Sequence, residues 1–261
     1  MKILIVTQNA PLYLPTFLES FIKIWKENDE GSIEIFIKPP YGQNSLYKEV
    51  VYRYKIYGTK AFLKISSKIF KNFILSNCYK LKFTKNCYSL SNVLKKFSID
   101  RKNFESINSI DSVNYVKNNI DLIISIASPE IFKKEILDAP KYGCINYHTA
   151  LLPKYRGRQP LFWALLNNEK TTGITIHKMD EFIDKGELII QKKINIDPQD
   201  SLDSLYIKTI EEGPNILFDA IKNLISNKNK LKSLKINNGV LYKLPTPMDA
   251  KKFRKMGKRF I

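Results

Sequence analysis

The sequence of 261 residues predicts an open α/β fold, in which a largely parallel sheet is covered by helices on both faces. Short apolar runs at residues 2–7, 33–38, 121–127 and 143–147 have the length and composition of buried strands. Helical patterns lie between them, and strands that alternate with helices favour a parallel sheet. A hydrophobic fraction of 44% and a charged fraction of 26% are ordinary for a folded chain and exclude disorder of the whole protein.

In the first half of the chain, predicted loops and helices alternate with the predicted strands. A loop over residues 8–15 leads from the first strand into a helical pattern over 17–25. After the third strand, Ser128 and Pro129 predict a helix over 130–137, because serine caps a helix amino terminus and proline is tolerated at the first helical position.

The second half predicts two further strands and a carboxyl-terminal extension. Residues 172–178 and 187–196 are β-like, and 201–225 form a long helical pattern interrupted by Gly213 and Pro214. Asn237-Asn-Gly239 lies between two short apolar runs, 234–236 and 240–243, which is a hairpin signal. Residues 251–261 contain six basic residues and no acid, and predict a mobile or ligand-covering tail. We therefore expect one domain over 1–200 and a helix, hairpin and basic tail over 201–261.

Composition restricts the possible function classes. The net charge of +18 comes from 37 Lys and only 6 Arg, and specific phosphate recognition favours arginine, so we do not expect a nucleic-acid partner. No apolar run is long enough to span a membrane and no signal-peptide pattern begins the chain, which favours a cytoplasmic protein without stable membrane insertion. Three widely spaced cysteines predict free thiols, and two histidines exclude a multi-histidine metal centre, although they do not exclude a carboxylate-rich one.

Residues 51–86 carry nine basic residues and no acid. A helical projection places Phe62, Ile65, Ile69 and Phe73 on one face, and lysines 60, 64, 68 and 71 on the other. Such a helix can lie on a membrane or bind a polyanion. The simpler interpretation is a surface helix that packs on the sheet and exposes its lysines to solvent.

Three polar residues form a candidate catalytic set. Asn146 and His148 lie two apart at the end of a predicted strand, so their side chains project to one face, where open parallel sheets bind ligands. Asp184 lies in a predicted loop from which a carboxylate can reach the same cleft. An amide that binds an oxyanion, an imidazole that moves a proton and a carboxylate that fixes the imidazole suit acyl transfer. Spacing alone also allows structural roles, with Asn146 closing a turn and Asp184 capping one.

The segments that surround these three residues resemble those of a known family. The segments are Asn146-Tyr-His148, Leu151-Leu-Pro-Lys-Tyr-Arg-Gly157, Pro160, Trp163-Ala164, Gly173-Ile-Thr-Ile-His177, Ile183-Asp184-Lys-Gly186 and Ile189-Ile-Gln191. They closely resemble the formyltransferases that use 10-formyltetrahydrofolate. The resemblance implies a Rossmann-like domain, 10-formyltetrahydrofolate as co-substrate without a metal, formyl transfer to a primary amine, and Asn146, His148 and Asp184 as catalytic residues.

The resemblance also implies ligand contacts. A folate pocket would involve Ile126, Ala127, Phe132, Met179, Asp180 and Ile183, with backbone atoms of loop 179–184 facing the pterin. Acceptor contacts would involve Gln8, Tyr155, Arg156, Arg158 and Trp163. The alternative is that the two arginines and Tyr155 are only solvent-exposed residues of a surface loop. His177 is interpreted as a hydrogen-bonded strand residue. Thr149-Ala150 and Lys185 depart from the family pattern, which puts local ligand contacts in question.

The acceptor is predicted to be a nucleotide-linked amino sugar. The loop after the first strand contains no glycine, unlike the glycinamide ribonucleotide enzymes, and only about thirty-five residues follow the long helix, fewer than methionyl-tRNA formyltransferases append. The alternatives are a methionyl-tRNA formyltransferase-like enzyme and a polyanion-binding module without catalysis. Apolar positions at Leu217, Phe218 and Ile221 predict a homodimer through the long helix and the hairpin that follows it.

Overall fold

A computed structural model describes residues 1–39, 46–226 and 239–261. Its seven-stranded sheet has the order β3-β2-β1-β4-β5-β7-β8. The strands are β1 (Lys2–Gln8), β2 (Ser32–Lys38), β3 (Asp100–Lys102), β4 (Leu122–Ile126), β5 (Cys144–His148), β7 (Thr171–Lys178) and β8 (Leu188–Asn195). Strands β1 to β5 are parallel, whereas β7 pairs antiparallel with both of its neighbours, β5 and β8. The predicted α/β class is confirmed, and its sheet is mixed.

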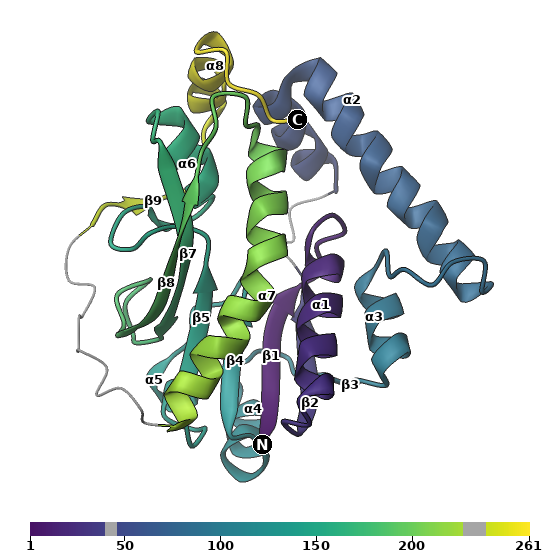
Figure 1. Ribbon diagram of the computed structural model, residues 1–261, viewed down its shortest axis with the longest axis vertical. Coiled ribbons are helices and arrows are strands. Elements are labelled where there is room, and N and C mark those ends of the chain that lie inside the picture. The colour runs from purple at the N-terminus through teal and green to yellow at the C-terminus, as the bar shows by residue number, and fades with distance from the viewer. Residues whose placement is uncertain (40–45, 227–238) are drawn as a thin grey trace.

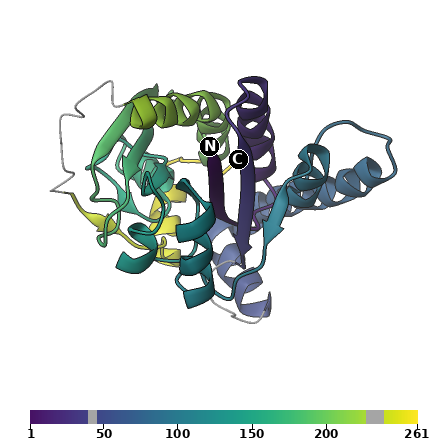
Figure 2. The same cartoon turned by 90° about the horizontal axis from the view of Figure 1, so that it is seen from below.

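Helices cover both faces of this sheet (Figures 1 and 2). The helices are α1 (Leu14–Glu27), α2 (Leu46–Lys80), α3 (Leu90–Phe97), α4 (Ile110–Asn119), α5 (Lys134–Leu137), α6 (Pro160–Leu166), α7 (Leu202–Ser226) and α8 (Pro247–Lys255). Helices α1 and α7 lie on one face and α4 and α5 on the other. Within the described ranges, no helix is both long enough and apolar enough to cross a bilayer.

Helix α7 belongs to the main hydrophobic core. Leu217 and Ile221 are fully buried, and the ring of Phe218 packs edge-on against Trp25 of α1 with 6.3 Å between centroids. The prediction that these residues form a dimer surface is therefore wrong, because α1 already covers them. Helix α7 also continues through Pro214 without the predicted interruption. The domain boundary at residue 200 stays a prediction.

The helix predicted over 130–137 shortens to α5, which starts at Lys134. Polar contacts hold the preceding residues out of helical conformation: the Glu130 carboxylate accepts a hydrogen bond from the backbone N–H of Ile107, and the Lys133 N–H donates to Asn108 Oδ1. The Ser128 hydroxyl accepts from the Glu130 N–H in a local turn instead of capping a helix. These contacts compete with the helical hydrogen bonds that the local sequence favours.

The basic carboxyl-terminal segment is anchored in a second hydrophobic cluster by its apolar residues. Phe253 of α8 is fully buried and stacks on Phe162 of α6 with 4.8 Å between ring centroids, and Phe260 packs on the same rings. The prediction of a mobile tail is wrong, because its aromatic residues are anchored in this cluster. Of the predicted hairpin, residues 234–238 lie outside the described part of the chain. The following strand, β9 (Leu241–Tyr242), pairs in parallel with β6 (Arg156–Gly157).

Candidate active site

The three predicted catalytic residues lie together beside strand β5. Asn146 and His148 occupy its carboxyl-terminal half, and Asp184 lies in the turn between β7 and β8. Strand β7 returns antiparallel along β5 and pairs His177 with Asn146. This pairing adds a second imidazole to the cluster that the sequence predicted.

The amide of Asn146 contacts two acceptors. Its Nδ2 donates to Asp184 Oδ1 at 3.1 Å and to His177 Nε2 at 3.3 Å. The opposite ring nitrogen of His177, Nδ1, donates to the backbone carbonyl of Lys178 at 2.7 Å, which leaves Nε2 as the accepting lone pair. His177 is thus a hydrogen-bonded strand residue, as predicted, and it also orients Asn146.

The imidazole of His148 is oriented by a backbone carbonyl. His148 is 6% exposed, and its Nε2 donates to the Tyr155 carbonyl oxygen at 2.9 Å. A carbonyl can only accept, so in the neutral ring the lone pair lies on Nδ1. Nδ1 is 3.7 Å from Asp184 Oδ2, too long for a hydrogen bond. The expectation that Asp184 fixes the imidazole is therefore corrected: Tyr155 fixes it, and Asp184 acts on it through charge.

Electrostatics set opposite charge states for these two groups. Burial lowers the pKa of His148, and this effect exceeds the opposing attraction of Asp184, so the ring is neutral near pH 7. Burial alone would raise the pKa of Asp184, but the neighbouring His148 and a hydrogen bond from the Gly157 N–H hold it well below its usual range. The site therefore presents a neutral base beside a carboxylate.

The loop that follows β5 is tied to the Asp184 turn. The Gly157 N–H donates to Asp184 Oδ2 at 2.7 Å. The buried Arg156 guanidinium donates to the Ile183 carbonyl at 2.6 Å and 3.0 Å and to the Gly239 carbonyl at 3.1 Å. Arg156 therefore holds backbone on both sides of the site, and a substrate contact from it stays a prediction.

The other predicted acceptor residues are spread around this loop. Tyr155 is buried, with its hydroxyl donating to Glu169 Oε1, and Gln8 is half-buried at the end of β1. Trp163 Nε1 donates to the carbonyls of Arg158 and Lys243. Their substrate contacts stay predictions.

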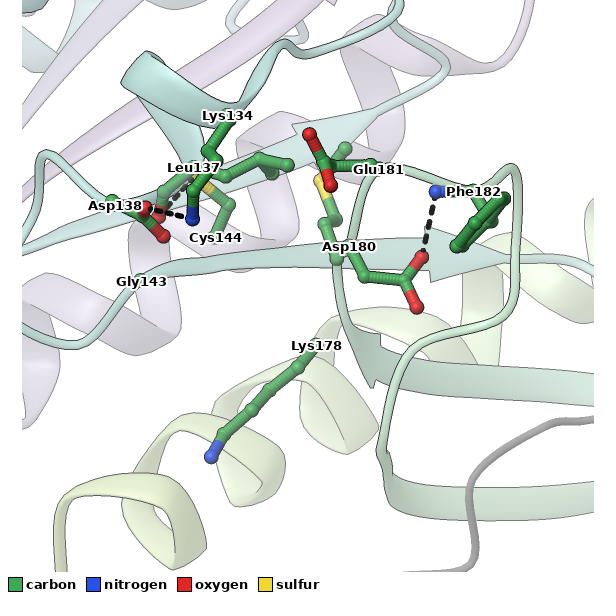
Figure 3. Close-up of a pocket in the computed structure, with 10 residues that line it drawn as sticks. Lys134, Leu137, Asp138, Gly143, Cys144, Lys178, Asp180, Glu181 and Phe182 are labelled. Carbon is green, nitrogen blue, oxygen red and sulfur yellow. Dashed lines mark hydrogen bonds and ion pairs between the residues drawn. The ribbon is translucent and has the colours of Figure 1, made fainter.

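Figure 3 shows a pocket of about 270 Å³ beside the start of β5 and the loop after β7. Its lining residues are Lys134, Leu137, Asp138, Gly143, Cys144, Lys178, Met179, Asp180, Glu181 and Phe182. Cys144 precedes Asn146 by two residues on β5, and Met179 follows His177 by two, so the pocket continues along the face of the sheet that carries the polar cluster.

Two of the predicted folate residues, Met179 and Asp180, line this pocket. Ile126 and Phe132 are instead 3% and 2% exposed, and Phe132 packs in the core under α4 and α5. Ala127 is exposed with a positive φ of 53°. Ile183 is 39% exposed, and its carbonyl is engaged by Arg156.

Comparison with known proteins identifies the class. The formyl transferase family profile matches residues 88–221, which include every residue of the polar cluster. The chain belongs to the formyl transferase family.

Curated relatives match a shorter region. A methionyl-tRNA formyltransferase of Agathobacter rectalis is 40% identical over 112 residues, 42% of this chain and 36% of that protein. One from Caldicellulosiruptor saccharolyticus is 44% identical over 108 residues, 41% of this chain and 35% of that protein. The matched region thus spans little more than a third of the length of these relatives.

Solved structures share the fold across nearly the whole chain. A sugar N-formyltransferase from Shewanella superimposes with a TM-score of 0.58 and 20% identity over 92% of this chain and 76% of that chain. A 4-N formyltransferase from Francisella tularensis gives 0.57 and 19% over 97% and 86%. Glycinamide ribonucleotide transformylase 1 from Symbiobacterium toebii gives 0.59 and 13% over 91% and 94%.

Proposed function

We propose that the protein transfers a formyl group from 10-formyltetrahydrofolate to a primary amine. Family membership supports the reaction class. The observation that carries the proposal is the joining of an amide donor, a neutral imidazole and a carboxylate in Asn146, His148 and Asp184. Attack by a neutral amine on a formyl carbon develops a negative oxygen and requires removal of a proton, which are the two tasks that these groups suit.

His148 acts as the general base at Nδ1. Its Nε2 donates to Tyr155, so Nδ1 carries the lone pair, and burial keeps the ring unprotonated. A proton taken from the amine makes the ring an imidazolium 3.7 Å from the Asp184 carboxylate. The imidazolium then gives this proton to the departing tetrahydrofolate nitrogen as its bond to the formyl carbon breaks, which restores the neutral ring. The attraction is strongest after proton transfer, so Asp184 stabilises the charged state of the base more than its resting state.

Asn146 binds the developing oxyanion by exchanging a partner. Both Nδ2 hydrogens are engaged in the structure, and the 3.3 Å contact with His177 Nε2 is the longer. A hydrogen bond to a charged oxygen is roughly twice as strong as one to a neutral acceptor. The exchange of His177 for the oxygen therefore becomes favourable as charge develops, which places the gain in the transition state.

The pocket beside Met179 fits the ring end of a folate. Leu137, Cys144 and Phe182 offer apolar contacts, while Asp180 and the backbone of its loop offer polar groups for a heterocycle edge. Its volume of about 270 Å³ is near the lower end of small-ligand pockets, so it suits the ring system and not the entire donor. When bound, this co-substrate supplies the activated formyl group. The loop that carries Asp184 then orients it.

Two acceptor classes are candidates. Methionyl-tRNA is favoured by the curated relatives, which are the more similar in sequence and bear that name. A nucleotide-linked amino sugar is the acceptor that the sequence resemblance favours. The sugar N-formyltransferases among the structural neighbours support this second candidate only through a shared fold.

Mass spectrometry of two reactions tests the proposal. The protein and 10-formyltetrahydrofolate are incubated with charged initiator tRNA or with a panel of nucleotide-linked amino sugars, and His148→Asn serves as the inactive control. Addition of a formyl group to either acceptor supports formyl transfer, and the acceptor modified decides the class. Transfer to tRNA should also weaken steeply with salt, because many phosphates release counterions. Absence of formylation with both acceptor classes would contradict the proposal.

A further inference from the structure

Helix α2 exposes apolar side chains along the surface that faces away from the protein body. Leu63 is 62% exposed, Phe70 63% and Ile74 45%. Phe73 on the same helix and Leu81 and Phe83 directly after it are also exposed. We call these six residues the apolar strip. Figures 1 and 2 show that the far end of α2 extends beside the sheet and projects from the molecule together with α3.

The spacing of the strip is helical. Positions 63, 70 and 74 are separated by 7 and 4 residues, which places them within about 20° of one line on a helix with 3.6 residues per turn. Lys60, Lys64 and Lys71 are exposed about one quarter turn away and form a row alongside the strip. The outer surface therefore combines an apolar line with a cationic border.

The opposite side of α2 is already occupied by the protein. After the break in the helix at Gly58, Ile65 is buried, and Lys68 forms an ion pair with Asp203 at the start of α7. Asn72 donates to the Pro11 carbonyl. The expected division into an apolar inner face and a lysine outer face is thus wrong in part, since Phe73 points outward and Lys68 inward. Helix α2 is apolar on two sides, and only one has a partner within the described chain.

We propose that the outer surface of α2 binds the interface of a phospholipid bilayer that carries anionic headgroups. An amphipathic helix lies in such an interface with Phe and Leu among the acyl chains and with lysines against the headgroups. Charge complementarity selects the anionic bilayer, because residues 51–86 contain nine basic residues and no acid. The helix lies on the bilayer surface and does not cross it.

Other occupants fit this surface less well. A second copy of α2 packed face to face would set one lysine row against another with no acidic residue between them, and like charges oppose such pairing. Nucleic-acid interfaces are strongly polar, whereas the middle of this surface is apolar. Phe70 can stack on a base, but its neighbours on the same line, Leu63 and Ile74, are aliphatic and cannot.

Vesicle sedimentation tests the proposal with the full chain. We expect the protein to sediment with vesicles of phosphatidylcholine and phosphatidylglycerol, to stay in solution with phosphatidylcholine alone, and to be released by high salt. The triple variant Lys60→Gln/Lys64→Gln/Lys71→Gln should lower the partition coefficient about 100-fold. The double variant Phe70→Ser/Ile74→Ser should lower it about 10-fold or more.

A matched control lies on the other face of the sheet. Ile110 of α4 is 79% exposed and Lys117 is exposed on the same helix, so Ile110→Ser/Lys117→Gln removes similar groups without touching α2. This control should sediment like the unchanged protein. All four proteins are compared by thermal unfolding, and since every altered side chain is exposed, their melting temperatures should agree.

Three outcomes would overturn the proposal. The first is no sedimentation with anionic vesicles, and the second is sedimentation that both α2 variants retain. The third is a dimer in solution, or binding to tRNA, that the Phe70→Ser/Ile74→Ser variant loses while vesicle binding is absent. That last result would assign the surface to a second copy of the chain or to RNA.

Discussion

His148 Nδ1 and Asp184 Oδ2 are 3.7 Å apart, a distance at which charges attract but no hydrogen bond forms. The imidazole is oriented from its other side by the Tyr155 carbonyl. Orientation and electrostatic support of the base are therefore supplied by different residues. Substitution of Asp184 should change the proton affinity of His148 without releasing its ring.

Replacement of His148 by Asn should abolish proton transfer and preserve the fold. We expect turnover to fall roughly 10²–10⁴-fold, the usual contribution of a positioned acid–base group. Turnover is measured under saturating co-substrate with whichever acceptor the protein formylates. Normal turnover in a sample that melts like the unchanged protein would remove His148 from the mechanism.

The pH dependence of kcat/KM should report His148. Burial lowers the pKa of this group below 6.5, and only the neutral ring accepts a proton, so activity should be retained down to pH 6.5 and decline below it. In Asp184→Asn the attraction that favours the imidazolium is lost, so the acidic limb should move to still lower pH while kcat falls. An acidic limb that moves upward in this variant would contradict the assigned roles.

The sequence predicted the fold class, because local patterns determine buried strands, and it predicted Asn146 and His148 as neighbours, because alternation in a strand is local. It could not predict that Tyr155 rather than Asp184 fixes the imidazole, since a backbone carbonyl carries no sequence signal. The contact of His177 with Asn146 depends on the antiparallel register of β7. The burial of Leu217 and the late start of α5 depend on tertiary neighbours, α1 and Asn108, that local patterns do not show.

His177 should affect catalysis through Asn146. Asn146→Ala should lower kcat roughly 10²–10³-fold by removing an oxyanion donor. His177→Phe removes the acceptor that orients the amide and should cost less, while His177→Gln keeps an acceptor and should recover part of the loss. The measurement is kcat for the three variants at one pH. If kcat falls equally in His177→Phe and His177→Gln, the ring of His177 does not act by accepting a hydrogen bond from Asn146.

Arg156 should stabilise the site by holding the Asp184 turn. Arg156→Met removes a buried guanidinium and leaves the Ile183 and Gly239 carbonyls without their charged donor, and we expect the free energy of unfolding to fall by about 2 kcal/mol. Denaturant unfolding measures the change, with Arg101→Met, an exposed arginine on β3, as the control. A stable Arg156→Met protein with a raised KM for the acceptor alone would instead support the predicted substrate contact.

Gly157 should tolerate no side chain, because its backbone joins two parts of the site. Its φ is 92°, a conformation that L residues rarely adopt, and an added Cβ would lie 2.3 Å from the Tyr242 carbonyl oxygen on β9. Gly157→Ala must therefore displace β6 from β9 or move the N–H that donates to Asp184 Oδ2. The Asp184 carboxylate would lose one of the interactions that keep its pKa low, and kcat should fall together with the melting temperature. Gly257→Ala is the matched control. That glycine also has a positive φ, 72°, so the backbone strain is similar, but an added Cβ there would have no atom within 4 Å. A Gly157→Ala protein as active as Gly257→Ala would show that the Gly157 N–H is dispensable for the charge state of Asp184.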